Sequence, residues 1–110
     1  MSDMDVLVHS PGVALNIRTE AAIQDRFEKL EHIQPGVIRC DVLLTRSTRK
    51  PGACVVQAKL IMRGYDLFAR ESGSSFIHAT RLVCADLENQ IRKRREQRPR
   101  HQPAAPPAEE

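Results

Sequence analysis

The sequence lacks the features that mark membrane-bound and secreted proteins. Its apolar residues, 41% of the 110, never form a run long enough to span a bilayer. The N-terminus has no positively charged leader followed by an apolar block. We therefore expect a cytoplasmic protein that has no membrane partner. A chain of this length has room for a single domain with one modest core.

The sequence also lacks histidines or cysteines at the spacings that bind a metal ion. The four histidines fall on different segments of the chain, at His9, His32, His78 and His101. The three cysteines, Cys40, Cys54 and Cys84, cannot all pair, and each falls at an apolar position where a free thiol behaves as a small hydrophobic side chain. We predict reduced, buried thiols, no metal and no cofactor.

Catalytic motifs are equally absent. The serine-rich segment from Ser72 to Ser75 precedes an apolar helical pattern, but neither the G-x-S-x-G nor the P-loop spacing occurs there. No nucleophile–base pair, carboxylate pair or ligand cluster stands out elsewhere in the sequence. We predict that the chain is not an enzyme, and that one of these serines caps the helix that follows.

The sequence does contain a regular succession of strand and helix patterns. Val6 and Val8 belong to an alternating apolar pattern that is typical of a short strand. Either Asn16 or Thr19 can cap the helix that follows, and Pro35 ends it. The buried stripe of this helix comprises Ile23, Phe27 and Leu30.

Period-two alternation then predicts two adjacent antiparallel strands, because the apolar face of each must meet the same core. The apolar positions of the first strand are Ile38, Cys40, Val42 and Leu44. Those of the second are Cys54, Val56, Ala58, Leu60 and Met62. Gly64 turns the chain into a fourth strand, in which Leu67 and Ala69 face inward. With the final helix described below, the element order is β-α-β-β-β-α, an α+β fold.

The last predicted helix has one continuous apolar stripe, so we expect it to lie along the sheet for most of its length. The stripe comprises Phe76, Thr80, Val83, Cys84, Leu87 and Ile91. No large apolar side chain that could hold the helix down follows Ile91, and we expect the basic turn beyond it to project past the sheet. From Pro99 onward the composition is that of a disordered segment. We therefore predict a folded domain over residues 1–98 and a disordered, Pro-rich tail over residues 99–110.

Positive charge is concentrated at the end of this helix. The net charge is only +3 and the isoelectric point is near 9.0. The cations crowded at the helix end are Arg92, Lys93, Arg94, Arg95, Arg98 and Arg100. Such a cluster is typical of a protein that binds a polyanion, since each cation that neutralises a phosphate releases condensed counterions. The alternative is a solvated helix end whose cations complement the helix dipole.

The order of the elements and two local strings resemble the ribosome hibernation promoting factors and ribosome-associated translation inhibitors, also called the sigma-54 modulation family. The resemblance covers about residues 5–97. One string is DRFEKLE at Asp25–Glu31, close to the family pattern basic-apolar-x-Lys-Leu-Glu in the first helix. The other is LENQIRK at Leu87–Lys93, near the end of the second helix.

This resemblance implies a four-stranded sheet with both helices on one face, similar to a double-stranded RNA-binding domain. It also implies binding to the small ribosomal subunit and its ribosomal RNA, in the channel that messenger and transfer RNA occupy. Bound there, the protein would block translation sterically under stress or in stationary phase. The positions that match basic family positions are Arg26, Lys29 and Lys93, and the same surface is extended by Arg92, Arg94 and Arg95.

The chain departs from the family on the exposed side of the second helix. Ser75 and Arg81 stand where the family commonly has acidic residues, and Asn89 stands where a basic residue is usual. We expect Arg81 and a basic hairpin tip to bind RNA in place of the missing basic residue. The tip comprises Arg46, Arg49 and Lys50. The alternative function is an RNA-binding or protein-docking adaptor of the same fold that does not inactivate ribosomes. Whether the chain promotes or opposes pairing of ribosomes stays open.

The sheet face turned away from the helices suggests one further partner. Its predicted apolar residues are Leu7, Leu43, Val55, Ile61 and Phe68, more than a face meant for water needs. One interpretation is ordinary scattered exposure of side chains that support strand pairing. The other is a homodimer, or another protein, docked on this open face.

Overall fold

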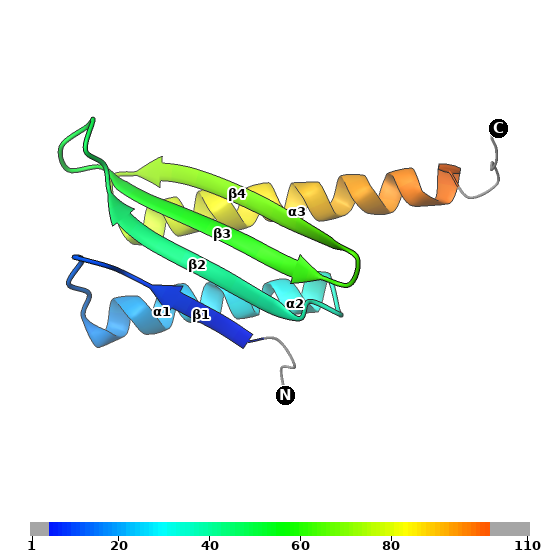
Figure 1. Cartoon of the computed structure of the whole chain (residues 1–110), viewed down its shortest axis with the longest axis horizontal. Helices are drawn as coiled ribbons and strands as arrows, with labels where there is room; N and C mark the ends of the chain where they lie inside the picture. Colours follow the sequence, from blue (N-terminus) through cyan, green and yellow to red (C-terminus); the bar gives the residue numbers. More distant parts are fainter. Residues whose placement is uncertain (1–4, 102–110) are drawn as a thin grey trace.

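The computed structural model describes residues 5–101, and of residues 96–101 only the backbone. The elements run in the order β1 (Asp5–His9), α1 (Ile17–Glu28), α2 (Leu30–Ile33), β2 (Arg39–Arg46), β3 (Cys54–Met62), β4 (Tyr65–Gly73) and α3 (Phe76–His101) (Figure 1). The predicted α+β class and element order are confirmed, with one short extra helix, α2.

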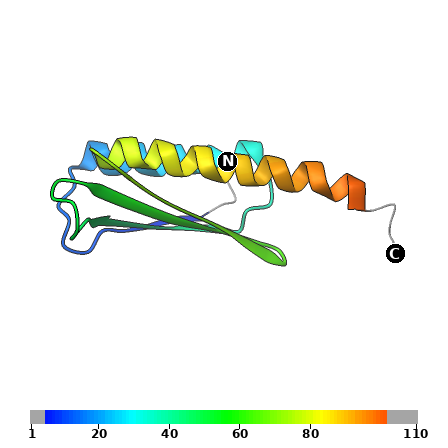
Figure 2. The ribbon, with the colours of Figure 1, turned by 90° about the horizontal axis from the view of Figure 1, so that it is seen from above.

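The four strands form one mixed sheet in the order β1-β2-β3-β4. β1 pairs with β2 in parallel, whereas β2–β3 and β3–β4 are antiparallel, as their hairpin connections require. A parallel pair needs a long crossover, and α1 and α2 supply it between β1 and β2. Figure 2 shows the helices lying together on one face of the sheet, which leaves the other face open. This is the arrangement that the family resemblance implied.

The first helix begins as the sequence predicts but ends earlier. The Asn16 side chain accepts a hydrogen bond of 2.7 Å from the Thr19 backbone N–H, so Asn16 is the cap of the two candidates. The helix is interrupted at Lys29, and the chain continues as the single turn of α2. Gly36, with a φ of +100°, then reverses the chain toward β2.

The core lies between the helical layer and the sheet. Every predicted apolar position of β3 and of the α3 stripe is buried, and so are Ile23, Phe27 and Leu30 of the first helical segment. Leu67 of β4 is only partly buried, and Ile38 is exposed at 49%, because β2 begins only at Arg39. Val37, only 2% exposed, occupies a core position instead.

Helix α3 starts at a serine cap and packs along the sheet. The Ser75 hydroxyl accepts a hydrogen bond of 3.1 Å from the His78 N–H, which confirms a serine cap and identifies it. The helix runs to His101, three residues past the domain boundary predicted at residue 98. Residues 102–110, most of the predicted disordered tail, lie outside the described residues, so the tail and the boundary stay predictions.

All three cysteines are free and buried, as predicted. Burial raises the pKa of the Cys40 and Cys84 thiols from the ordinary 9.0 to about 12, because the charged thiolate would lose its hydration. Among the side chains that the structure describes, those of residues 5–95, no cluster of three or more His, Cys, Asp or Glu could hold a metal ion. No helix in this part of the chain is long and apolar enough to cross a membrane.

Candidate nucleic-acid interface

The outer side of α3 carries exposed cations. Residues spaced by four and eleven positions share one face of a helix, which places Arg81, Ala85 and Arg92 on the side away from the core stripe. Lys93 lies beside this face and is also exposed. Among the described residues, Arg81 and Lys93 have no carboxylate partner, and Arg92 donates only to the Asn89 side-chain oxygen at 3.1 Å. These three cations are therefore available to an external anion.

The next two arginines of the same run face the protein instead. Arg94 and Arg95 follow Ile91 by three and four residues, so they continue the inward stripe. The Arg94 guanidinium lies 3.5 Å from the centre of the Tyr65 ring, a cation–π contact to the start of β4. Arg95 donates to the Gln34 side-chain oxygen at 3.2 Å and to the Ile33 carbonyl at the end of α2. The basic turn is therefore tied to the fold as far as Arg95, while the backbone of α3 continues past the end of the sheet, as the sequence predicts (Figure 1).

The two predicted basic residues of the first helical segment differ in their surroundings. Arg26 of α1 approaches the buried Cys84 thiol of α3, where its charge acts against the rise in the pKa of that thiol caused by burial. Lys29 forms an ion pair of 3.5 Å with Asp25, and both side chains are more than half exposed. Such an exposed pair contributes little to stability and is easily exchanged for a phosphate partner.

Arg18 is a cation of the helical layer that sequence reasoning missed. It is exposed near the start of α1, eight residues before Arg26 and eleven before Lys29. This spacing puts the three cations along one side of the α1 segment, the side on which Arg26 meets α3. Helical spacing in the sequence is enough to predict Arg18 on this side of the helix, whereas in this helix the family resemblance involves only the string Asp25–Glu31.

The predicted hairpin tip lies apart from the helical layer. Arg49 and Lys50 belong to the loop between β2 and β3, at the end of the sheet away from the C-terminal end of α3 (Figure 1). Arg46, at the end of β2, turns to the helix side and lies 5.5 Å from the centre of the Phe76 ring. The structure thus places α1 and α3, which carry most of the predicted cations, in one layer, but it does not place Arg49 and Lys50 beside them.

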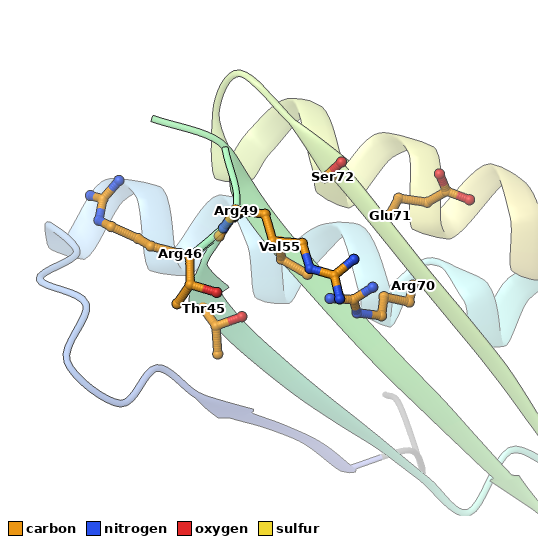
Figure 3. A pocket seen from close by; sticks show the side chains of 9 residues that line it. Thr45, Arg46, Arg49, Val55, Arg70, Glu71 and Ser72 are labelled. Carbon is orange, nitrogen blue, oxygen red and sulfur yellow. Dashed lines mark hydrogen bonds between the residues drawn. The ribbon is translucent and has the colours of Figure 1, made fainter. Parts of the chain in front are cut away.

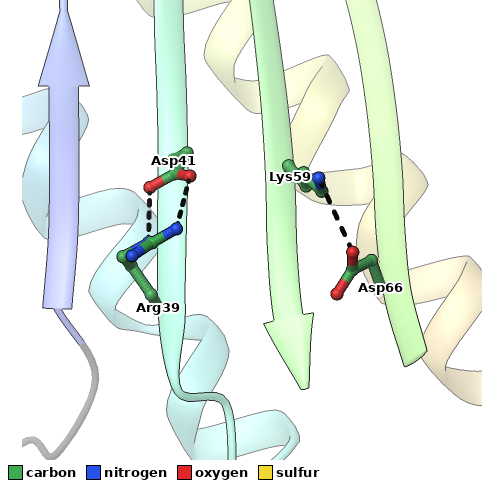
Figure 4. Close-up of polar contacts among 4 residues, drawn as sticks. All are labelled: Arg39, Asp41, Lys59 and Asp66. Atoms are coloured by element: carbon green, nitrogen blue, oxygen red, sulfur yellow. Dashed lines mark hydrogen bonds and ion pairs between the residues drawn. The ribbon is translucent and has the colours of Figure 1, made fainter. Parts of the chain in front are cut away.

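The open face of the sheet is less apolar than the sequence suggested. Leu7 and Phe68 are 44% and 54% exposed there, but Val55 is buried at 6%. Two ion pairs lie on the same face: Arg39 with Asp41 along β2 at 2.9 Å, and Lys59 of β3 with Asp66 of β4 at 3.6 Å (Figure 4). The apolar side chains are therefore separated by charges. The predicted homodimer through this face stays a prediction.

Taken together, the fold and its helical layer define a small α+β protein with a cationic helical surface. The chain belongs to the family described as Sigma 54 modulation protein / S30EA ribosomal protein, whose sequence profile matches residues 6–99. This confirms the resemblance found in the sequence and the prediction that the chain is not an enzyme. No curated protein matched the sequence in a direct search.

Solved structures of other proteins share the fold. A ribosomal subunit interface protein from Coxiella burnetii superposes with a TM-score of 0.72 at 17% identity, covering 84% of this chain and 99% of that one. The N-terminal domain of Protein Y from Thermus thermophilus gives a TM-score of 0.67 at 14% identity, covering 84% and 98% of the two chains. At such low identity, these likenesses establish the fold and leave the contacts to be argued from this chain's own residues.

Proposed function

We propose that this protein binds the small ribosomal subunit through ribosomal RNA and blocks the channel of messenger and transfer RNA, which silences idle ribosomes in the cytoplasm under stress or in stationary phase. The observation that carries the proposal is the set of unpaired cations on the outer side of α3, Arg81, Arg92 and Lys93. Membership of a family that includes a ribosomal protein in its description supports the choice of the ribosome.

The geometry supports contact with a folded RNA surface better than with a small ligand. Helices α1 and α3, which carry these cations, lie in one layer on the same face of the sheet (Figure 2). Cations displayed on a broad face neutralise several phosphates at once, which gives binding strength that falls steeply with salt. Steric exclusion from the channel then requires only occupancy, without any chemical step.

The proposal is tested by sedimenting the protein with purified ribosomes and by measuring translation in a cell-free reaction. We expect the protein to sediment with small subunits and intact ribosomes at low salt, to be released as salt rises, and to reduce translation of a reporter. Protein that stays at the top of the gradient at every salt concentration would contradict the proposal.

The adaptor alternative gives a different result in the same experiment. An RNA-binding adaptor of this fold would bind free structured RNA as tightly as it binds intact subunits, and it would leave reporter translation unchanged. Asn89, where the family usually has a basic residue, is the feature that keeps this alternative distinct.

A further inference from the structure

A polar hollow of about 620 Å³ lies on the sheet where the β2–β3 hairpin meets the end of β4. Thr45, Val55 and Ser72 are in register across β2, β3 and β4 and line its floor. Their neighbours in the chain, such as Leu44 and Val56, point into the core under the helices. The hollow therefore opens on the face of the sheet that the helices do not cover.

Two arginines meet in this hollow without a carboxylate between them. Figure 3 shows the side chains of Arg49 and Arg70 extending toward each other over Val55, while Arg46 and Glu71 point away from them. No ion pair or hydrogen bond engages the guanidinium of Arg49 or Arg70 within residues 5–95. Two converging positive charges without a counter-ion repel each other, and a bound anion would relieve that repulsion.

The backbone of the hairpin holds Arg49 in place. The Ser47 hydroxyl accepts hydrogen bonds from the N–H groups of Arg49 at 3.2 Å and of Lys50 at 3.0 Å. The Ser47 N–H also donates to the Ala53 carbonyl at 3.0 Å, which closes the loop. Arg70 stands on the middle of β4, paired in register with Gln57. The two cations therefore project from ordered backbone, so less conformational entropy is lost on binding.

The chemistry of the lining selects the ligand. Planar guanidinium groups match the paired oxygens of a phosphate, and the hydroxyls of Thr45, Thr48 and Ser72 add donors around them. No aromatic ring is among the lining residues, so a free nucleotide would find nothing on which to stack its base. A phosphate that is already held in a polymer needs no such platform.

We infer that Arg49 and Arg70 clamp a backbone phosphate of RNA in this hollow, as a second RNA contact on the sheet face opposite the helical layer. The inference rests on the proposed function for RNA as the source of the phosphate. It adds Arg70, which the sequence did not single out, and it separates Arg49 from Lys50, which lines a different hollow at the tip of the loop. With contacts on both faces, the protein would lie between two RNA segments.

The test is a titration of the full chain, labelled with ¹⁵N, with a short RNA duplex, with inorganic phosphate and with adenosine monophosphate. We expect RNA to shift the side-chain Nε resonances of Arg49 and Arg70, together with the backbone amides of Thr45 and Ser72. The double variant Arg49→Gln/Arg70→Gln should bind the duplex about tenfold more weakly. The matched control is Arg63→Gln, which changes an exposed arginine at the β3–β4 turn, at the other end of the sheet. We expect this control to weaken binding of the duplex by less than about twofold.

Each remaining outcome overturns the inference. RNA shifts confined to α1 and α3, or equal affinities of the double variant and the Arg63→Gln control, would show that the hollow does not bind RNA. Concentrations of phosphate, adenosine monophosphate and RNA are compared as concentrations of phosphate groups. If either small ligand saturates the hollow at the same concentration as RNA does, the hollow is a site for small phosphates instead. Ribosome sedimentation, measured separately, tests the proposed function, so failure of one is distinguished from failure of the other.

Discussion

Arg92 and Lys93 differ from Arg94 and Arg95 in surroundings, although the four are consecutive and all carry positive charge. The first two stand on the outer side of α3, without a carboxylate partner within the described residues. The second two hold the helix to Tyr65, Gln34 and the end of α2. A helix turns by about 100° per residue, so consecutive cations point to different sides of it. Some are available to bind RNA, and others contact the rest of the protein. Counting cations in such a run therefore overstates the binding surface.

The largest expected effect comes from neutralising the outer pair. Arg92→Gln/Lys93→Gln should weaken ribosome binding about thirtyfold at physiological salt, since two cations that would each neutralise a phosphate are removed, and should leave the free energy of unfolding within about 0.5 kcal/mol of wild type. Quantitative co-sedimentation and urea denaturation measure the two quantities. Unchanged affinity would remove these residues from the interface.

The inner pair should show the reverse pattern. Arg94→Gln/Arg95→Gln removes the same charge, but it breaks the cation–π contact to Tyr65 and the bonds to the α2 end, and we expect a loss of about 1.5 kcal/mol of folding free energy. Ribosome affinity at a temperature where the variant is folded should change less than about threefold. A variant as stable as wild type but much weaker in binding would mean that these arginines also face the RNA.

The pH dependence of stability tests whether the Cys84 thiol, on the inward side of α3 beside Arg26, is buried. Burial raises the pKa of Cys84 to about 12, whereas the unfolded chain loses the same proton near 9.0. The stabilising difference is fully present below pH 9 and is lost as the pH rises toward 12, by up to about 1.4 kcal/mol per pH unit. Urea denaturation from pH 8 to pH 11 should give a shallower decline for Cys84→Ala than for wild type. Parallel declines would contradict the burial of this thiol.

The smallest effect is expected at the N-terminal cap of α3, where a substitution lowers the stability but changes no charge. Ser75→Ala removes the cap and should cost about 1 kcal/mol of folding free energy, while Ser74→Ala, an exposed neighbour, should cost less than about 0.5 kcal/mol. Both variants keep every cation, and both should bind ribosomes like wild type when folded. Weak binding by folded Ser75→Ala would indicate that loss of stability, rather than charge, explains the other variants.

The fold was largely predictable from apolar spacing. The stripes of α1 and α3 and the alternation in β3 each have a period that fits only one kind of element, and the buried residues follow them. Ile38 and the break at Lys29 were not predictable, because both depend on where a turn places the chain relative to the sheet. Spacing indicates which side of an element is apolar, but the exact ends of elements depend on tertiary contacts.

The candidate interface was predictable only in part. The outer position of Arg92 follows from its helical spacing, and the missed Arg18 could have been found in the same way. The contacts of Arg95 with Ile33 and Gln34 join residues about sixty positions apart, and no local pattern indicates them. The meeting of Arg49 with Arg70 depends likewise on the register of β3 with β4. Sequence patterns identify cations, whereas their partners are set by the fold.

The central claim is that Arg92 and Lys93 bind RNA, whereas Arg94 and Arg95 hold the helix to the fold. The most direct test is the salt dependence of ribosome binding, measured side by side for wild type and for the two double variants, Arg92→Gln/Lys93→Gln and Arg94→Gln/Arg95→Gln. The plot of log affinity against log salt concentration should become shallower by about 2 for the outer pair, and its slope should be unchanged for the inner pair. Equal slopes for the two double variants would contradict the account, because the two pairs would then contribute equally to the contact with RNA.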